Sequence, residues 1–409
     1  MGNNLLMKKK ETVSVKVAQE RLRQIEIKPG TEIIGVSEAL GRICAQDVYA
    51  VINQPPFPRS PLDGYAVRSQ DTQGASIKTP VKLKVIEHIC AGMYPSKKVE
   101  SGEAVKIMTG APIPEGADGI IKQELTDEGN ENVELYESVQ AYGNYCFQGE
   151  DVKQGMLLFE KGVQLRYMHV GIMASQGMEN IEVYAVPKIG IMATGDELIS
   201  AGQPLIPGKI YDSNGPLLEA RVSELGCSAL RLKSLRDDAR GLAEAVKSAI
   251  GHCNALITSG GVSVGVRDCM PDLAKLLNAE VLFHGINAKP GSPMMVMVIE
   301  GKLVFCLSGN PFAAAATFEV LVRPVLERMR GREEWKPQRV WGKLNTAFQK
   351  PSAVRRYVRG RIEDGIVWLP EGRHSSGMLA SMAGCNCLVD IPGDSGKLNA
   401  GASVEVILL

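Results

Sequence analysis

The sequence predicts a multidomain α/β protein whose largest domain is a mostly parallel sheet with helices on both faces. Three observations predict this class. Between residues 186 and 332, short apolar runs alternate with helical patterns, which is typical of doubly wound folds. Residues 62–150 contain only short β-type runs between turn residues, and such runs return after Gly331. A chain of 409 residues has the length of two or three domains.

The N-terminal part is expected to contain two short pieces with a β-rich segment between them. Residues 12–26 carry apolar side chains on one stripe and predict an amphipathic helix, and residues 43–51 are strand-like. Residues 55–61 hold four prolines, which exclude a helix or a central strand and mark a domain boundary. A strand pattern over residues 157–165 and a helix pattern over 166–176 follow the β-rich segment. Neither short piece could bury a core alone. The two short pieces, 12–54 and 151–185, could therefore belong to one small mixed domain, separate from a β domain over residues 55–150.

The C-terminal part is expected to contain the α/β/α domain and a second β domain. Strand patterns occur at residues 188–193, 228–233, 255–258, 280–286, 294–299 and 303–307. Helix patterns occur at residues 216–225, 239–250, 271–277 and 312–330. This alternation predicts a three-layer domain over residues 186–332. Runs at 338–348, 357–362, 366–369, 388–391 and 403–408 predict a barrel or a sandwich over residues 333–409.

The composition argues against several classes of protein. Lys plus Arg and Asp plus Glu each number 46, and a net charge of zero disfavours general binding to nucleic acid or anionic membranes. Aromatic residues make up only 5% of the chain, which disfavours base-stacking platforms. No apolar run approaches the roughly 20 residues that span a bilayer, and the first ten residues lack the order of a secretory signal. We therefore expect a cytoplasmic protein.

The nine cysteines indicate a reducing compartment. Their number is odd, most lie singly in apolar contexts, and no CxxC pair occurs. Cys385 and Cys387 are the one close pair, and a local alternation of small and apolar residues explains them as well as a metal or redox site does. The five histidines are scattered, which disfavours a zinc site.

Chemically informative residues follow the predicted parallel strands. Ligands in an open parallel sheet bind at the carboxyl ends of the strands. The segments found there contain Asp196 and Glu197, Asp237 and Asp238, Ser259 to Gly265 followed by Asp268, and Ser308 to Pro311. We expect the acidic residues to converge on one rim of the sheet.

The segment Ser259-Gly-Gly-Val-Ser263 is a candidate phosphate cradle. Its glycines, Gly260 and Gly261, would let backbone N–H groups approach an anion closely. A plain turn capped by Ser263 would explain the same residues, and the segment matches neither the Walker motif nor GxGxxG. Carboxylates beside a phosphate suggest Mg²⁺, although each acid alone could be a helix cap or a solvated loop residue. Lys289 adds a cation for a phosphate or an oxyanion, or is a surface lysine.

Eight segments, taken together, resemble the molybdopterin molybdenumtransferase family, which is similar to the C-terminal domain of gephyrin. The segments are Pro55–Val67 (PPFPRSPLDGYAV), Ile107–Asp118 (IMTGAPIPEGAD), Gly149–Asp151, Thr194–Leu198 (TGDEL), Ile210–Asn214 (IYDSN), Ser259–Gly265 (SGGVSVG), Lys289–Gly291 and Gly309–Pro311. They occur in the order of the family and cover the chain from about residue 12. Composition alone would leave Asp63 and Thr109 as turn residues.

The resemblance implies four domains, a homodimer, and an active site between the α/β domain of one subunit and the β insertion of the other. It implies insertion of molybdate into adenylylated molybdopterin with Mg²⁺-dependent release of AMP, downstream of a molybdopterin adenylyltransferase. Glu197, Asp237 and Asp268 would handle metal, molybdate or pterin phosphate. Asp63, Thr109 and Asp151 would come from the partner subunit. Ser259, Gly260, Gly261, Ser263, Lys289, Asn310, Arg359 and Ser376 would bind substrate.

Three positions depart from the usual pattern of that family. Gly285 stands where many members have a second lysine, Ser292-Pro293 stands where Lys-Pro often follows Lys-Pro-Gly, and Ser308 stands where proline precedes Gly309. The loss of cations leaves a preference for tungstate open. The sequence is also compatible with a molybdopterin adenylyltransferase or with a non-catalytic scaffold of the same fold. Residues 323–361 carry an excess of nine positive charges, which could steer a pterin phosphate or form a solvated surface.

Overall fold

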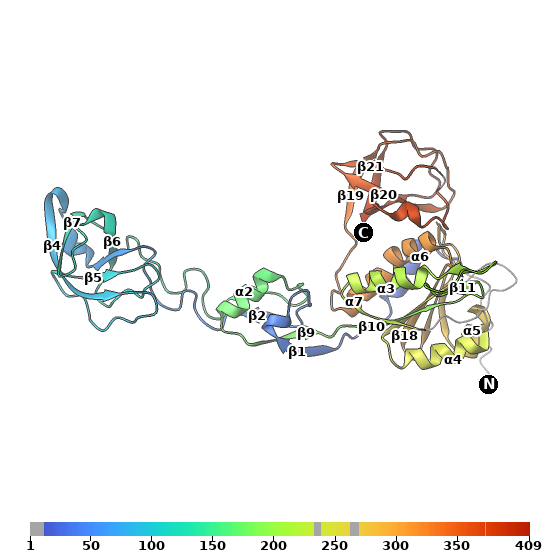
Figure 1. The fold of residues 1–409 in the computed structure, drawn as a ribbon, viewed down its shortest axis with the longest axis horizontal. Coiled ribbons are helices and arrows are strands. Elements are labelled where there is room, and N and C mark those ends of the chain that lie inside the picture. The colour runs from blue at the N-terminus through green and yellow to red at the C-terminus, as the bar shows by residue number, and fades with distance from the viewer. Residues whose placement is uncertain (1–11, 233–238, 262–269, 373) are drawn as a thin grey trace. The chain divides into compact units, whose positions relative to one another are not determined.

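Figure 1 shows the computed structural model, which describes residues 12–232, 239–261, 270–372 and 374–409. In the described parts the chain divides into two compact units. The first comprises Met1–Ile33, Gly41–Ala45 and Glu182–Leu409, and the second comprises Ile34–Leu40 and Gln46–Ile181. The four narrower domain ranges expected from the sequence remain a prediction.

The first unit contains a six-stranded sheet in the order β13-β10-β14-β18-β17-β15. The strands are β13 (Ser228–Arg231), β10 (Lys188–Ala193), β14 (Ala255–Ser259), β18 (Lys302–Leu307), β17 (Met295–Ile299) and β15 (Glu280–His284). The four strands from β13 to β18 pair in parallel, while β17 and β15 are added antiparallel. The expected mostly parallel sheet is confirmed.

Helices cover both faces of this sheet (Figure 1). On one face lie α3 (Asn214–Glu224), α6 (Pro311–Thr317), η4 (Phe318–Val322) and α7 (Arg323–Met329), and on the other lie α4 (Ala239–Ile250) and α5 (Met270–Leu276). Strand β10 shows the alternation that two covered faces require. Ile189 and Ile191 pack into the core beneath α3 and α7, whereas Met192 packs into the core beneath α4 and α5. The expected three-layer arrangement is confirmed.

The helix after β18 contains a π-type segment, η4, followed by a proline. Pro324 has no N–H to donate to the carbonyl of Val320, four residues earlier. Gln19 of α1 (Val15–Arg23) instead donates its Nε2 to that carbonyl at 3.1 Å. Within η4, the buried Glu319 accepts from Arg221 at 2.7 Å and from Arg323 at 2.8 Å. These contacts attach the N-terminal helix to the α/β layers.

The C-terminal strands close into a five-stranded barrel. They are β19 (Arg339–Leu344), β20 (Arg355–Glu363), β21 (Ile366–Trp368), β22 (Cys387–Ile391) and β23 (Ser403–Leu408). The order β20-β21-β19-β23-β22 returns to β20 through a β20–β22 pairing, which settles the choice between barrel and sandwich. The short strand β16 (Ala288–Lys289) pairs in parallel with the first two residues of β20. The helix η5 (Ala380–Met382) lies between β21 and β22 in the chain.

The second unit is dominated by a five-stranded sheet in the order β6-β3-β5-β4-β7. These strands are β6 (Gly119–Lys122), β3 (Gly64–Val67), β5 (Glu103–Ile107), β4 (Ser76–Ile89) and β7 (Asn132–Glu137), with η2 (Ser69–Thr72) and η3 (Gln123–Leu125) between them. The remaining elements are β2 (Val48–Tyr49), paired with β8 (Leu157–Phe159), then η1 (Val36–Glu38) and α2 (Tyr167–Ser175). Strand β1 (Thr31–Gly35) pairs with β9 (Asn180–Tyr184).

Residues 43–51 were expected to be a strand, and only Val48–Tyr49 forms one. Cys44 and Ala45 of this run instead meet the chain at residues 182–183 through isolated contacts. No helix among the described residues is both long enough and apolar enough to cross a bilayer.

Candidate active site

Three loops of the first unit meet at the carboxyl ends of β10, β14 and β18. The N–H of Thr194 donates to the carbonyl of Ser259 at 2.8 Å, and the N–H of Gly260 donates to the carbonyl of Leu307 at 3.1 Å. Gly260 has a φ of 102°, and a Cβ there would lie 2.1 Å from the carbonyl oxygen of Thr194. Only glycine fits this crossing, so Gly260 of the expected cradle is required by the junction itself.

Ser259 is placed at this junction with its hydroxyl already engaged. Its Oγ accepts from Asn214 Nδ2 at 2.7 Å and donates to the carbonyl of Ser308 at 3.2 Å, and the side chain is buried. Asn214 Nδ2 also donates to the carbonyl of Gly309 at 2.8 Å. Asn214 therefore links the ends of β14 and β18, and its buried Oδ1 has no hydrogen-bond partner among the residues that the structure describes. In the sequence, Asn214 was marked only as part of the matching segment Ile210–Asn214.

Glu197 lies on the turn after β10, and its side chain is exposed. Its carboxylate folds back over Gly195, because a Cβ on Gly195 would come within 2.7 Å and 2.8 Å of the two carboxylate oxygens. The backbone of the same turn pairs β11 (Leu198–Ile199) with β12 (Ile210–Tyr211). Lys209 Nζ donates to the carbonyl of Asp196. The turn thus holds the Glu197 carboxylate accessible at the strand ends, next to the exposed Asp196.

Four residues of the expected strand-end site lie outside the described residues: Asp237, Asp238, Ser263 and Asp268. Of the three expected metal ligands, only Glu197 can be placed. Within residues 12–232, 239–261, 270–372 and 374–409, no three His, Cys, Asp or Glu side chains group as metal ligands. A single carboxylate fits Mg²⁺ in the manner common at phosphate sites, where the substrate supplies further oxygen ligands.

A second part of the site is a cationic pocket between the α/β layers and the barrel. The cavity has a volume of about 220 Å³, and Lys289, Phe312, Arg356, His374 and Ser376 are among its lining residues. Lys289 and Arg356 are register partners in the parallel β16–β20 pairing. Like charges on paired strands repel each other, and an anion between them would relieve that repulsion. Arg356 and His374 were not predicted, because their sequence neighbours form no motif.

Arg359 strengthens the positive potential behind this pocket. Its side chain is only 1% exposed, its guanidinium stacks on the Phe312 ring at 4.5 Å, and its Nη2 has no hydrogen-bond partner in the described part of the chain. Its Nε donates to Ser381 at 2.6 Å and its Nη1 to the carbonyl of Ser375 at 3.3 Å. Burial lowers the pKa of Arg359. A buried guanidinium bonded to neutral groups favours a nearby anion.

His374 shares this environment. Burial lowers its pKa, and the cations Arg359, Lys350 and Arg356 lower it further. Its ring packs against Phe348, with centroids 5.6 Å apart. Asn310 and Ser376 meet at the same place, because the N–H of Phe312 donates to the carbonyl of Ser376 at 3.0 Å and a Cβ on Gly377 would lie 3.6 Å from Asn310 Oδ1.

The second unit brings together two of its three expected residues. Asp63 Oδ1 accepts two hydrogen bonds of 2.7 Å from Thr109, one from the backbone N–H and one from the hydroxyl. These bonds, the backbone one foremost, hold the pKa of Asp63 below its usual value. The N–H of Asp151 donates to the carbonyl of Gln54 at 3.1 Å, and its carboxylate is exposed.

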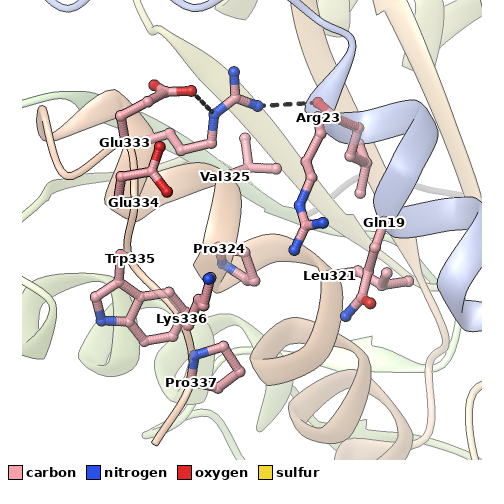
Figure 2. Close-up of a pocket in the computed structure, with 12 residues that line it drawn as sticks. Gln19, Arg23, Leu321, Pro324, Val325, Glu333, Glu334, Trp335, Lys336 and Pro337 are labelled. Atoms are coloured by element: carbon pink, nitrogen blue, oxygen red, sulfur yellow. Dashed lines mark hydrogen bonds and ion pairs between the residues drawn. The ribbon is translucent and has the colours of Figure 1, made fainter.

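A larger cavity, of about 340 Å³, lies apart from all of these residues (Figure 2). Gln19 and Arg23 of α1 line one side, and Trp335 and its neighbours after α7 line the other. Arg328 also lines the cavity, and it donates to the carbonyl of Leu22 at 3.1 Å and to Glu333 at 3.0 Å. This cavity lies between α1 and α7, and none of the expected site residues that the structure describes lines it.

Comparison with known families accounts for nearly the whole chain. The MoeA N-terminal region (domain I and II) matches residues 13–177, a probable molybdopterin binding domain matches residues 190–328, and the MoeA C-terminal region (domain IV) matches residues 342–409. A molybdopterin molybdenumtransferase of Staphylococcus epidermidis is 34% identical over 405 residues, covering 98% of this chain and 97% of the relative. The chain belongs to the MoeA family of molybdopterin molybdenumtransferases.

Two further relatives agree with this MoeA assignment, and a third shares the fold. A molybdopterin molybdenumtransferase of Staphylococcus aureus is 35% identical over 407 residues, which is 99% of this chain and 97% of the relative. A crystal structure of the molybdopterin biosynthesis MoeA protein from Pyrococcus horikoshii has a TM-score of 0.88 at 34% identity, covering 97% of this chain and 99% of that one. A Pyrococcus furiosus molybdenum cofactor biosynthesis protein is 18% identical with a TM-score of 0.61.

The departure at Gly285 has a structural reason in this member of the MoeA family. Gly285 has a φ of 101°, and a Cβ there would lie 2.9 Å from Thr12 Oγ1. Its carbonyl also accepts from the N–H of Val13 at 3.1 Å. A lysine would be strained on this backbone, and the second cation that lines the pocket is Arg356 on the neighbouring strand.

Proposed function

We propose that this protein inserts molybdate into adenylylated molybdopterin and releases AMP in a Mg²⁺-dependent step. The observation that carries the proposal is the cationic pocket of Lys289 and Arg356, backed by the buried Arg359, in a chain that matches the MoeA family from end to end. Molybdate is a tetrahedral dianion, and a pocket of about 220 Å³ accommodates it with part of a substrate phosphate.

The pocket suits an oxyanion for electrostatic reasons. Two cations on paired strands and a third beneath Phe312 create a field that no described carboxylate lining the pocket offsets. Ser376 adds a hydroxyl at the rim. Hydrogen bonds from charged donors are stronger than neutral ones, so we assign molybdate binding to Lys289, Arg356 and Ser376, with Arg359 as electrostatic support.

Glu197 would hold Mg²⁺ at the strand ends, together with Asp237 and Asp268 as the resemblance implies. When bound, the ion would screen the negative charge of the phosphoric anhydride during its cleavage. Asn310 would position substrate beside the Ser376 loop. Asp63, fixed by Thr109, would act as an oriented hydrogen-bond acceptor, and Asp151 would provide a second carboxylate.

We also propose that the enzyme acts as a cytoplasmic homodimer with its active site at the subunit interface. The small β2–β8 part of the second unit exposes an apolar surface made of Tyr49, Val51, Ile52, Met156, Leu157, Tyr167, Met168 and Ile172. Tyr49 and Leu157 are register partners on β2 and β8. Exposed apolar surfaces of this kind are typical of interaction sites, and we assign this one to a second copy of the chain. A molybdopterin adenylyltransferase would supply the substrate.

The test is reconstitution with adenylylated molybdopterin, Mg²⁺ and either molybdate or tungstate. AMP and metallated cofactor are measured together, and equal amounts of both are expected with molybdate. Lys289→Met is expected to raise the KM for molybdate about tenfold, because a charged hydrogen bond contributes roughly 1.5–3 kcal/mol. Lys397→Met, at an exposed lysine of the barrel domain, is the matched control. AMP release without metal insertion, or an unchanged KM in Lys289→Met, would contradict the proposal.

A further inference from the structure

Three aromatic side chains gather on one turn of the second unit. The ring centroids of Tyr142, Tyr145 and Phe147 are 5.4, 5.2 and 4.8 Å apart in pairs. Tyr142 is 56% exposed and Phe147 is 47% exposed. In a chain with only 5% aromatic residues, three clustered rings with two exposed faces require an explanation beyond core packing, because core packing would bury them.

The backbone holds these rings in a fixed arrangement. Tyr142 has a φ of 64°, in the left-handed region that bulky residues avoid, and Asn144 has a φ of 52° in the same region, which asparagine adopts more readily. Asn144 Nδ2 donates to the carbonyl of Ile120 at 3.0 Å, and the N–H of Ile120 donates to the carbonyl of Gly143 at 3.0 Å. Strained backbone of this kind persists where its surroundings determine it, and it is concentrated at ligand sites.

Backbone hydrogen bonds connect the aromatic turn to the segment that carries the Asp63–Thr109 pair. Arg59 and Cys146 exchange two backbone hydrogen bonds of 3.0 and 3.1 Å. On the other side of this segment, the N–H of Ser60 donates to the carbonyl of Ala111 at 3.0 Å, and the carbonyl of Ser60 accepts from the N–H of Gly110 at 2.8 Å. One strand-like segment therefore separates the aromatic turn from the residues that immediately follow Thr109.

A carboxylate is fixed at the edge of the aromatic cluster. Glu150 accepts from the N–H of Phe147 and from Cys146 Sγ, each at 2.9 Å. These two bonds lower the pKa of Glu150, with the Cys146 bond the larger cause. Open aromatic faces beside a charged acceptor suit a planar heterocycle that stacks through its face and donates N–H groups from its edge.

We propose that Tyr142, Tyr145 and Phe147 form a stacking platform for the fused heteroaromatic ring of the substrate, either its pterin or its adenine. Glu150 accepts a hydrogen bond from the ring edge. The proposal rests on the proposed function, since adenylylated molybdopterin contributes both rings. The test must distinguish this role from two others. The three rings could instead contact a partner subunit, or they could only stabilise the turn.

The test measures binding of two probes, AMP and 6-hydroxymethylpterin, to the full-length protein by calorimetry. Tyr142→Ala with Phe147→Ala is expected to weaken binding of the probe that the platform holds by about tenfold, an effect within the range for losing one stacked base. Tyr142→Phe keeps the ring and is expected to bind as the wild type does. Tyr94→Ala removes a tyrosine that is 80% exposed in the same unit, and it is the matched control.

Phe147→Leu keeps apolar bulk but removes the aromatic face, and it tests the proposal if the double variant does not fold. Weaker binding of one probe with an unchanged melting temperature supports stacking and identifies the ring. A lower melting temperature with unchanged affinity for both probes overturns it, as does a wild type that binds neither probe at millimolar concentration. If the probes bind through these rings but the wild-type protein inserts no metal, the proposed function is refuted and the platform stands. If Phe147→Leu keeps full insertion activity and an unaltered KM, the platform is refuted and the proposed function stands.

Discussion

The two hydrogen bonds from Thr109 lower the pKa of Asp63, and this makes its pKa the most direct test of the pair. Thr109→Val removes the hydroxyl bond and leaves the backbone bond. The pKa of Asp63 is therefore expected to rise toward its ordinary value without reaching it. Carboxyl-carbon NMR titration measures this shift directly. Thr109→Ser keeps the hydroxyl and is expected to keep the lowered pKa, whereas an unchanged pKa in Thr109→Val would show that the hydroxyl bond is absent in solution.

The sign of the associated pH dependence follows from the direction of this shift. A carboxyl whose pKa is lowered by folding stabilises the protein above its unfolded pKa, and the contribution is lost as pH falls through the folded pKa. If Asp63 acts as a charged acceptor, the acid limb of the activity profile is expected to move to higher pH in Thr109→Val. The same profile measured for Thr109→Ser should overlay that of the wild type.

The sequence marked single residues where a strand end or a matching segment drew attention to them, and it missed residues whose partners come from distant parts of the chain. The roles expected for the marked residues remain predictions. Glu197 lies on the expected turn, and Asp63 meets Thr109 although composition alone left both as turn residues. Arg356 and His374 join Lys289 only because β16 pairs with β20 of the barrel. That pairing is a tertiary event with no local pattern, so the sequence could not indicate a pocket there.

At the scale of elements, the contact between α1 and η4 predicts a specific loss of stability. Gln19→Ala leaves the buried carbonyl of Val320 without the side-chain donor that compensates for Pro324. The free energy of unfolding is expected to fall by about 1–3 kcal/mol, the cost of an unsatisfied buried polar group. Chemical denaturation measures this change. Gln24→Ala, at an exposed position at the end of the same helix, is the control and is expected to change little.

A double variant separates this mechanism from a general loss of packing. Pro324→Ala restores an N–H four residues after Val320, so Gln19→Ala is expected to cost less in that background. Equal costs in both backgrounds would mean that the Gln19 contact acts independently of the proline. The element itself was predictable from its helical period, but the π-type segment within it was not, because it depends on Pro324 and on the buried charges around Glu319.

The remaining elements show the same division between local and tertiary information. The alternating strands and helices of the α/β layers carry their own period, and they form as predicted. The run at residues 43–51 has strand-like composition, yet only Val48 and Tyr49 find a paired strand, β8. The C-terminal runs were compatible with a barrel or a sandwich, because the β20–β22 pairing that closes the barrel joins segments distant in sequence.

At the scale of the whole molecule, the proposed homodimer predicts complementation between two inactive variants. Asp63→Asn lies in the second unit and Glu197→Gln in the first. If each active site takes Asp63 from one subunit and Glu197 from the other, a heterodimer of these variants contains one doubly altered site and one intact site. Purification through two different tags isolates that heterodimer, and its AMP release is expected to be about half that of the wild type.

The matched control pairs Asp63→Asn with Asp151→Asn. These two changes lie in the same unit, so they leave one defect in each site and are expected to restore nothing. Recovery in both heterodimers, or in neither, would show that these residues do not meet across a subunit interface.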